Sequence, residues 1–176
     1  DEAIALASHR PKKVIVFNRK LGARVPFKKH DIDYDALVYG SEEAPCVPVN
    51  SNHPLYILYT SGTTGKPKGI VRDTGGYAVA LKFSMKYIYN VKEEETFWAA
   101  SDMGWAVGHS YILYGPLLNR NTTIIFEGKP IKTPDASTFW RIISDHKVGT
   151  MFTAPTAIRA IKKEDPDGEF IKQYDL

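Results

Sequence analysis

Residues 59–69, YTSGTTGKPKG, concentrate groups that bind anions. Glycines leave backbone N–H groups accessible to an anion because no Cβ obstructs the approach. Hydroxyl side chains donate hydrogen bonds to phosphate oxygens or bind a hydrated magnesium ion, and lysines add positive charge. This composition predicts a polyphosphate-binding loop; the alternative is a solvated turn that combines these features by chance. The glycines are Gly62, Gly65 and Gly69, the hydroxyls are those of Thr60, Ser61, Thr63 and Thr64, and the lysines are Lys66 and Lys68.

The loop differs from the two commonest nucleotide-binding motifs. A Walker loop has glycines five residues apart, followed by Lys-Ser/Thr at the start of a helix. Here Gly62 and Gly65 are three residues apart, and Pro67 follows the lysine. No G-x-G-x-x-G fingerprint is present either. Because residues 66–73, KPKGIVRD, are more typical of a strand than of a helix, we predict a loop between two strands.

The order of the other elements predicts an α/β fold with a mainly parallel sheet flanked by helices. Helical spacing follows Thr74, with Tyr77 and Leu81 on the apolar face. In residues 133–147 we predict Thr133 as the N-cap and Pro134 as the first helical residue. The apolar stripe of this helix includes His146. The predicted strands are residues 13–17, 54–60, 96–101, 122–128 and 149–154, and a third helix begins at Pro155.

Composition excludes several classes of function. The chain has 176 residues, 43% of them hydrophobic, and a net charge of only +3, which argues against nucleic acid or an anionic membrane as the main partner. Cys46 is the single cysteine, so neither an internal disulfide nor a cysteine-based zinc site is expected. The proline-rich segment 40–54 is predicted to be a surface connection, and no second, separately folded domain is expected.

Two further segments identify a resemblance. Residues 101–117, SDMGWAVGHSYILYGPL, and 150–161, TMFTAPTAIRAI, follow the loop in the order found in the adenylate-forming superfamily, which includes the acyl-CoA synthetases. The chain is most similar to the short-chain branch, which activates acetate and propionate. Residues 71–81, VRDTGGYAVAL, are closer to the propionyl type. An unrelated nucleotide-binding module with a convergent loop is the weaker alternative, because it leaves GWAVGH and TAPTAIR unexplained.

The resemblance implies a two-step reaction with ATP, Mg²⁺ and coenzyme A. A carboxylate attacks the α-phosphate of ATP to give an acyl-adenylate and pyrophosphate, and the coenzyme A thiolate then attacks the adenylate. Lys66 and Lys68 would be the catalytic cations, with Lys68 closing the loop. The residues implied to hold the β- and γ-phosphates are Thr60, Ser61, Gly62, Thr63, Thr64, Gly65 and Lys66.

The segment GWAVGH is implied to line the acyl pocket through Trp105, Ala106, Val107 and His109. Members specific for acetate commonly carry Val-Thr where this chain has Ala106 and Val107. The smaller Ala106 leaves room for an extra carbon, so we predict propionate over acetate. His109 is expected to pack against or orient the pocket and not to act as a base, because the substrate carboxylate is already ionised.

Other residues near these motifs have two interpretations each. Val107 and Ala154 are implied to line the coenzyme A route, although Val107 replaces a threonine and Ala154 could simply end a strand before Pro155. Gly75 and Gly76 suit either close approach to a ligand or helix–sheet packing. Asp102 is expected to cap the turn that enters GWAVGH, not to act in catalysis.

Complete members of this superfamily are longer and carry motifs absent after Ala154, including a magnesium-binding glutamate and a lysine in a mobile C-terminal domain. The resemblance therefore implies that residues 1–176 are an internal section of the AMP-binding N-terminal domain, without the C-terminal domain. No metal ligand is expected in this chain. The isolated chain is expected to be inactive, and the alternative function is that of a truncated, non-catalytic nucleotide-binding fragment.

The expected partners are small-molecule substrates and the remainder of a parent polypeptide, with neither nucleic acid nor membrane among them. Propionate chemistry is compatible with the mitochondrial matrix of a eukaryote or the cytoplasm of a bacterium. The four remaining histidines show no metal-ligand spacing: His9, His30, His53 and His146.

Overall fold

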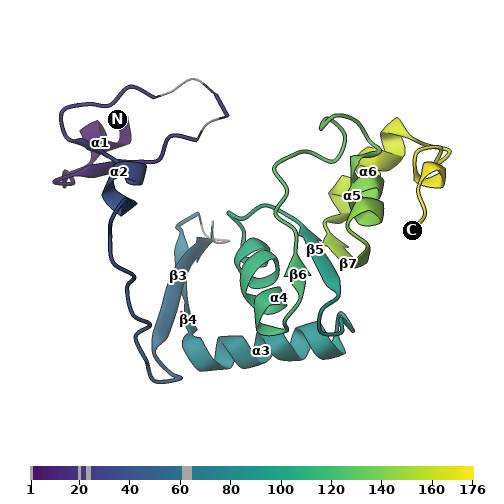
Figure 1. Cartoon of the computed structure of the whole chain (residues 1–176), viewed down its shortest axis with the longest axis horizontal. Coiled ribbons are helices and arrows are strands. Elements are labelled where there is room, and N and C mark those ends of the chain that lie inside the picture. Colours follow the sequence, from purple (N-terminus) through teal and green to yellow (C-terminus); the bar gives the residue numbers. More distant parts are fainter. Residues whose placement is uncertain (1, 20, 23–24, 61–64) are drawn as a thin grey trace. The chain divides into compact units, whose positions relative to one another are not determined.

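The computed structural model describes residues 2–19, 21–22, 25–60 and 65–176 (Figure 1). The chain divides into two compact units, Asp1–Pro48 and Val49–Leu176. The boundary falls inside residues 40–54, the segment predicted to be a surface connection. The assignment of all 176 residues to a single section of a larger domain remains a prediction.

The first unit is a small parallel strand pair with two short helices. Its strands are β1 (Val14–Val16) and β2 (Asp31–Asp33), and its helices are α1 (Glu2–Leu6) and α2 (Tyr34–Val38). The strands pair in parallel from Val14 opposite Asp31 to Val16 opposite Asp33. Asp33 also caps α2, because its carboxylate accepts a hydrogen bond of 2.9 Å from the Asp35 N–H.

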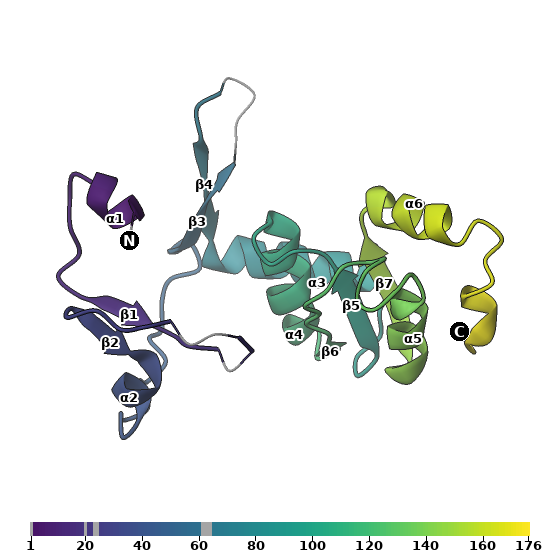
Figure 2. The same cartoon turned by 90° about the horizontal axis from the view of Figure 1, so that it is seen from above.

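The second unit begins with a hairpin, followed by a helix. Strands β3 (Pro54–Thr60) and β4 (Lys68–Asp73) are antiparallel, and α3 (Thr74–Tyr87) follows at once (Figure 2). Asp73 caps α3 by accepting a 2.7 Å hydrogen bond from the Gly76 N–H. The predicted strand at 54–60, the second strand and the helix after Thr74 are all confirmed.

The rest of the second unit contains the parallel sheet. Strand β5 (Thr96–Ala100) lies in the centre, between β6 (Thr122–Thr123) and β7 (Val148–Thr153), and both neighbours run parallel to it. The helices are a π-helix, η1 (Gly108–Tyr114), which continues into α4 (Gly115–Leu118), and then α5 (Thr138–Asp145), α6 (Pro155–Glu164) and the short 3₁₀-helix η2 (Ile171–Gln173). The predicted α/β architecture with a parallel sheet and flanking helices is therefore present.

Both faces of β5 are covered by apolar side chains. Phe97 and Ala99 point to one face and pack with Met85, Val91 and Ile112. Trp98 points to the opposite face, as strand alternation requires. Its cluster also contains Ala136, Phe139 and Ile161.

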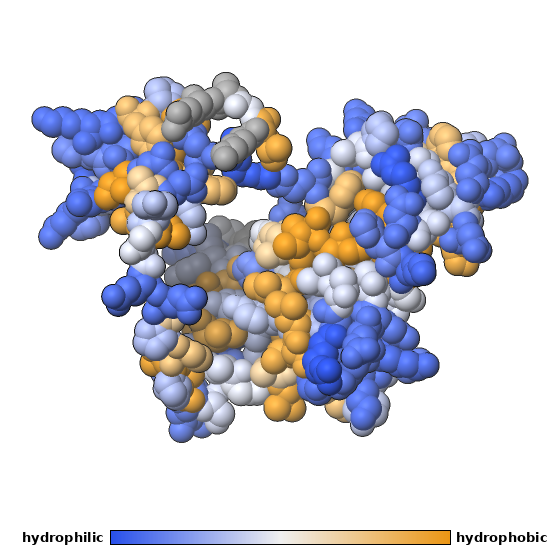
Figure 3. Space-filling model, in the orientation of Figure 1, coloured by the Kyte–Doolittle hydropathy of each residue, from blue (hydrophilic) through white to orange (hydrophobic). Residues whose placement is uncertain are grey.

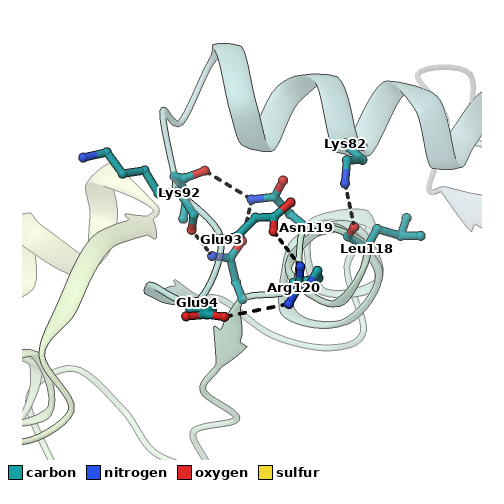
Figure 4. A network of polar contacts seen from close by, with 9 residues as sticks. Lys82, Lys92, Glu93, Glu94, Leu118, Asn119 and Arg120 are labelled. Carbon is teal, nitrogen blue, oxygen red and sulfur yellow. Dashed lines mark hydrogen bonds and ion pairs between the residues drawn. The ribbon is translucent and has the colours of Figure 1, made fainter.

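Two buried asparagines join the end of α4 to the turn before β5 (Figure 4). Asn119 Nδ2 donates to the Val91 carbonyl at 3.1 Å and to Asn121 Oδ1 at 2.8 Å. Asn121 Nδ2 in turn donates to the Lys92 carbonyl at 2.6 Å. These bonds satisfy polar groups that would otherwise be buried without partners. The neighbouring ion pair of Arg120 with Glu93 is exposed and contributes little by comparison.

The helix at residues 133–147 starts later than predicted. Thr133 and Pro134 precede it, and α5 begins at Thr138. The Asp135 carboxylate accepts hydrogen bonds from the N–H and hydroxyl of Ser137, which hold this stretch as a turn and lower the pKa of Asp135. The placement of His146 on a buried stripe is also wrong, because His146 is the exposed residue that ends the helix.

The predicted strand at 122–128 is shorter than expected. Only Thr122 and Thr123 pair with β5. Ile124 and Phe126 still pack on the Trp98 cluster without making ladder bonds, while Ile125 is 68% exposed. The apolar character of the run thus reflects side-chain burial on one face and not strand pairing.

Burial is concentrated around β5, whereas the hairpin remains mostly exposed. Large apolar side chains of β3 and β4, such as Ile57 and Val71, are open to solvent. Apolar surface is visible between hydrophilic residues in the space-filling view (Figure 3). Among the described residues, none of the helices has the length and apolar character required to cross a membrane.

Gly75 is packed too closely for a side chain. Its N–H donates a 2.7 Å hydrogen bond to the Ser51 carbonyl, and a Cβ on Gly75 would lie 2.6 Å from Ser51 Cβ. Gly75 thus packs against the turn that precedes β3 and not against the sheet, and its approach to a ligand stays a prediction. We expect Gly75→Ala to lower the free energy of unfolding by about 1–3 kcal/mol, as overpacking does. Urea unfolding measures this, with Gly149→Ala as the matched control because its Cβ would meet only ordinary contacts. Equal stability of the two variants would contradict the prediction.

Tyr89 makes stability sensitive to alkaline pH. Its ring contacts Phe97, Tyr111 and Phe152, and burial, with Tyr111 adding to the effect, raises its pKa to about 12. Because an unfolded tyrosine ionises near pH ~10, the unfolded state loses its proton first and stability falls as the pH rises from ~10 to ~12. We expect the free energy of unfolding of wild type to fall more steeply over this window than that of Tyr89→Phe. Parallel curves would show that Tyr89 does not carry the effect.

Candidate functional site

The predicted phosphate-binding loop connects the two strands of the hairpin. The ladder runs through Tyr59 opposite Gly69 and closes with Thr60 opposite Lys68. A Cβ on Gly69 would lie 3.1 Å from Ile57 Cγ2 and 3.3 Å from the Tyr59 ring, so the glycine lets this ring pack across the strands. The prediction of a loop between two strands is confirmed.

The described loop residues lie at the end of the hairpin where the loop joins its two strands. Gly65 has φ +79°, a left-handed conformation that glycine adopts without strain. The side chains of Lys66 and Lys68 are exposed, as a cation that meets a soluble anion must be. Their roles, and that of Thr60, stay predictions. Four of the predicted phosphate-binding residues lie outside the described residues: Ser61, Gly62, Thr63 and Thr64.

The predicted acyl segment follows β5 directly. The Asp102 carboxylate accepts a 2.6 Å hydrogen bond from the Gly104 N–H, and the Asp102 carbonyl accepts one from the Trp105 N–H. The capping role expected for Asp102 is therefore confirmed. Gly108, which begins η1, is buried against the same turn: a Cβ there would lie 2.5 Å from the Asp102 carbonyl oxygen. The glycine allows the helix to start this close to the strand end.

The four predicted acyl-pocket residues lie together but differ in exposure. Trp105 is 71% exposed and Ala106 is exposed, whereas Val107 and His109 are half-buried. The described residues therefore leave the Trp105 side chain open to solvent. The His109 ring packs edge-on against Tyr56 with ring centroids 5.5 Å apart, which favours the packing interpretation of His109.

A cavity that the sequence analysis missed lies at the carboxyl ends of the parallel strands. Its volume is about 460 Å³. Ligands of open α/β sheets bind in this position. The signal that could have indicated it is the polar pair Ser101 and Asp102 directly after a buried strand. Its lining residues are Ala100, Ser101, Asp102, Met103, Ile112, Ile125, Phe126, Glu127, Gly128, Pro130, Phe139 and Ala157.

Ala154 lies between β7 and α6, close to the same edge of the sheet. It is the exposed N-cap residue of α6, in an extended conformation with ψ 143°. The Thr153 hydroxyl donates a 3.1 Å hydrogen bond to the Ala100 carbonyl, which joins the ends of β7 and β5. Ala157, one turn into α6, lines the cavity. Ala154 directly follows the strand, which ends at Thr153, and a role beside coenzyme A stays a prediction.

No group of three or more histidine, cysteine, aspartate or glutamate side chains that could hold a metal ion occurs in residues 2–19, 21–22, 25–60 and 65–176.

Residues 2–176 match the family model described as AMP-binding enzyme, and the chain belongs to this family. It corresponds to the region of the AMP-binding N-terminal domain, so the resemblance to the adenylate-forming superfamily is confirmed.

Comparison with individual proteins places the chain beside the short-chain branch. It is 53% identical over 177 residues to the human acyl-CoA synthetase short-chain family member 3, mitochondrial, a match that covers all of this chain and 26% of the relative. The Bos taurus protein of the same name is 54% identical with the same coverage. Acetyl-coenzyme A synthetase of Rhodobacter capsulatus is 49% identical over 150 residues, which are 84% of this chain and 22% of the relative. The chain thus spans about a quarter of the length of the curated relatives it matches.

Proposed function

We propose that this chain acts within a longer acid–CoA ligase (AMP-forming) that activates a short-chain carboxylate through an acyl-adenylate to an acyl-CoA. The observation that carries the proposal is the family match over residues 2–176. The names of the relatives, short-chain acyl-CoA synthetase and acetyl-coenzyme A synthetase, support a short-chain acid as substrate.

The hairpin end fits the polyphosphate of ATP. Adenylation concentrates negative charge on the departing pyrophosphate, and fixed cations and N–H donors at that point lower the barrier. Lys66 and Lys68 are exposed beside the left-handed Gly65, so both ammonium groups can reach a bound anion. Mg²⁺ would neutralise further phosphate charge, and we assign it no protein ligand among the described residues.

The acyl segment would orient the carboxylate. At neutral pH the substrate carboxylate is ionised and needs no base. We therefore assign His109 no role as a base, and its ring packs against Tyr56. Val107 and Ala154 would form walls along which the coenzyme A thiolate reaches the acyl carbonyl. The C–S bond then forms as the C–O bond to AMP breaks.

We propose that the 176 residues alone do not complete the reaction. Relatives about four times as long carry the same segment, and the magnesium-binding glutamate and mobile lysine implied by the family lie outside it. The alternative is a non-catalytic nucleotide-binding chain. The name of the human relative supports a mitochondrial location, and the bacterial source of the Rhodobacter capsulatus relative is compatible with a bacterial cytoplasm.

The two loop lysines give the first test. In the complete enzyme that carries this sequence, we expect the double variant Lys66→Ala, Lys68→Ala to lower carboxylate-dependent pyrophosphate–ATP exchange by about 100-fold or more, because two charge-stabilising groups are lost. The matched control is Lys163→Ala, an exposed lysine at the end of α6. Normal exchange by the double variant would overturn the phosphate assignment.

Ala106 gives the test of the acid. Wild-type enzyme should prefer propionate to acetate and butyrate in the same exchange assay. Ala106→Val should shift the propionate-to-acetate ratio of kcat/KM toward acetate by about 10-fold or more, since a methylene in a pocket is worth ~1–3 kcal/mol. Ala80→Val, at an exposed position of α3, is the control. A clear acetate preference in wild type would defeat the propionate assignment.

A further inference from the structure

An aromatic cluster joins the hairpin to the acyl segment. We call Tyr56, Tyr77, Tyr114 and His109 the tyrosine cluster. The Tyr56 ring lies edge-on to Tyr77 at 5.6 Å and to His109 at 5.5 Å, and parallel to Tyr114 at 6.4 Å. Tyr77 and Tyr114 are edge-on to each other at 5.9 Å. Aromatic pairs at these separations stabilise a contact beyond the burial of their surfaces.

The members of the tyrosine cluster come from elements that carry different parts of the proposed site. Tyr56 is on β3, four residues before Thr60, where the phosphate loop begins. His109 is on η1, two residues after Val107 of the acyl segment. Tyr77 is on α3 and contacts the Tyr56 ring, with the Arg72 guanidinium of β4 over the Tyr77 ring at 5.7 Å. Tyr56 is therefore the direct contact between the strand that enters the loop and the acyl segment.

A hydrogen bond reinforces the same junction. The Tyr77 hydroxyl and Ser110 Oγ are 2.7 Å apart, and Tyr77 is only 8% exposed. Burial raises the Tyr77 pKa, so the hydroxyl stays protonated and hydrogen-bonded. Ser110 lies in the π-helix, a rare helix type that occurs frequently at functional sites. A second side chain, Thr123, donates to the Ile112 carbonyl of this helix at 2.7 Å.

This arrangement is more specific than core packing requires. The apolar core of the unit lies around β5, in two clusters that contain none of the four residues. A purely apolar contact would not need the Tyr77 hydroxyl or its bond to Ser110. The tyrosine cluster instead brings β3 into contact with the start of the π-helix, which immediately follows residues 105–107.

We propose that Tyr56 and Tyr77 are positioning residues that hold the acyl segment at a set distance from the strand entering the phosphate loop. The proposal rests on the proposed function, in which the carboxylate and the ATP phosphates are bound by these two segments. A misplacement of about 1 Å between reacting groups lowers the rate by up to ~100-fold. Loss of the Tyr56 ring contact should therefore lower turnover and reduce the discrimination between acids of different chain length. The contacts to the phosphates should persist.

The first experiment compares Tyr56→Leu with Tyr56→Phe in the complete enzyme, with propionate- and acetate-dependent pyrophosphate–ATP exchange as the assay. Tyr56→Leu should lower kcat by about 10–100-fold and leave the KM for ATP within about 2-fold, the pattern of lost positioning. The ratio of kcat/KM for propionate to kcat/KM for acetate should move toward one. Tyr56→Phe, which keeps the ring, should retain most of the activity. The control is Tyr87→Leu, an exposed tyrosine of α3 outside the tyrosine cluster.

The second experiment does not depend on activity. Amide hydrogen exchange of residues 108–114 should be faster in Tyr77→Phe and in Ser110→Ala than in wild type, and the double variant should add little because both remove one bond. Unchanged exchange rates in these variants together with an unchanged kcat in Tyr56→Leu would overturn the positioning role. A rise in the KM for ATP as large as the fall in kcat would also overturn it. If wild type catalyses exchange with no carboxylate, the proposed function itself fails, and the failure is visible before any variant is made.

Discussion

The structure depends most on the burial of β5 on both faces. Phe97 and Trp98 are completely buried and point in opposite directions, so one apolar cluster of the second unit forms on each face of β5. The Trp98 ring contacts Phe139 at 4.8 Å and Phe126 at 5.8 Å. Its Nε1 has no hydrogen-bond partner among the described residues, a cost of about 1–3 kcal/mol that apolar burial of the large ring offsets. The position of β5 is thus set by apolar packing.

The buried strand also decides where polar chemistry can occur. A parallel strand covered on both faces exposes functional groups only where it ends, and here that end carries Ser101 and Asp102. The Asp102 turn, with Gly108 packed against it, redirects the chain from β5 into the π-helix within a few residues. The acyl segment therefore lies at the boundary between a rigid strand and a helix. In such a site the packed core fixes the geometry, and the segment that connects the strand to the helix supplies the functional groups.

The sequence predicted best where local chemistry and burial agree. Residues 54–60 have the apolar composition of a strand, and Pro155 suits the first turn of α6, so both were placed correctly. The start of α5 was wrong because Asp135 and Ser137 form side-chain hydrogen bonds that compete with the helix, an effect that apolar spacing does not reveal. His146 has the spacing of the apolar stripe, but the helix ends at this residue and leaves its side chain exposed.

At the candidate site, too, the sequence predicted local motifs but not contacts between distant residues. The phosphate-loop and acyl residues were recognisable because their types and order form motifs. The cavity at the strand ends and the tyrosine cluster were not, since each is assembled from residues distant in the sequence: Tyr56 and His109 are 53 positions apart yet their rings are in contact. No residue type in either segment signals the other.

Motifs identify which groups take part in the chemistry, whereas the relative placement of those groups is a property of packing. In this chain the loop lysines lie on a largely exposed hairpin. Because exposed strands bury little apolar surface, packing stabilises their position only weakly. Their placement relative to the acyl segment must then come from the few contacts that reach the hairpin from buried elements. Tyr77 is such a residue, buried on α3 and bonded to Ser110, and Tyr56 is the hairpin side chain that meets it. The hairpin is therefore placed both by this contact between β3 and the π-helix and by the hydrogen bonds of Ser51 and His53 to the start of α3.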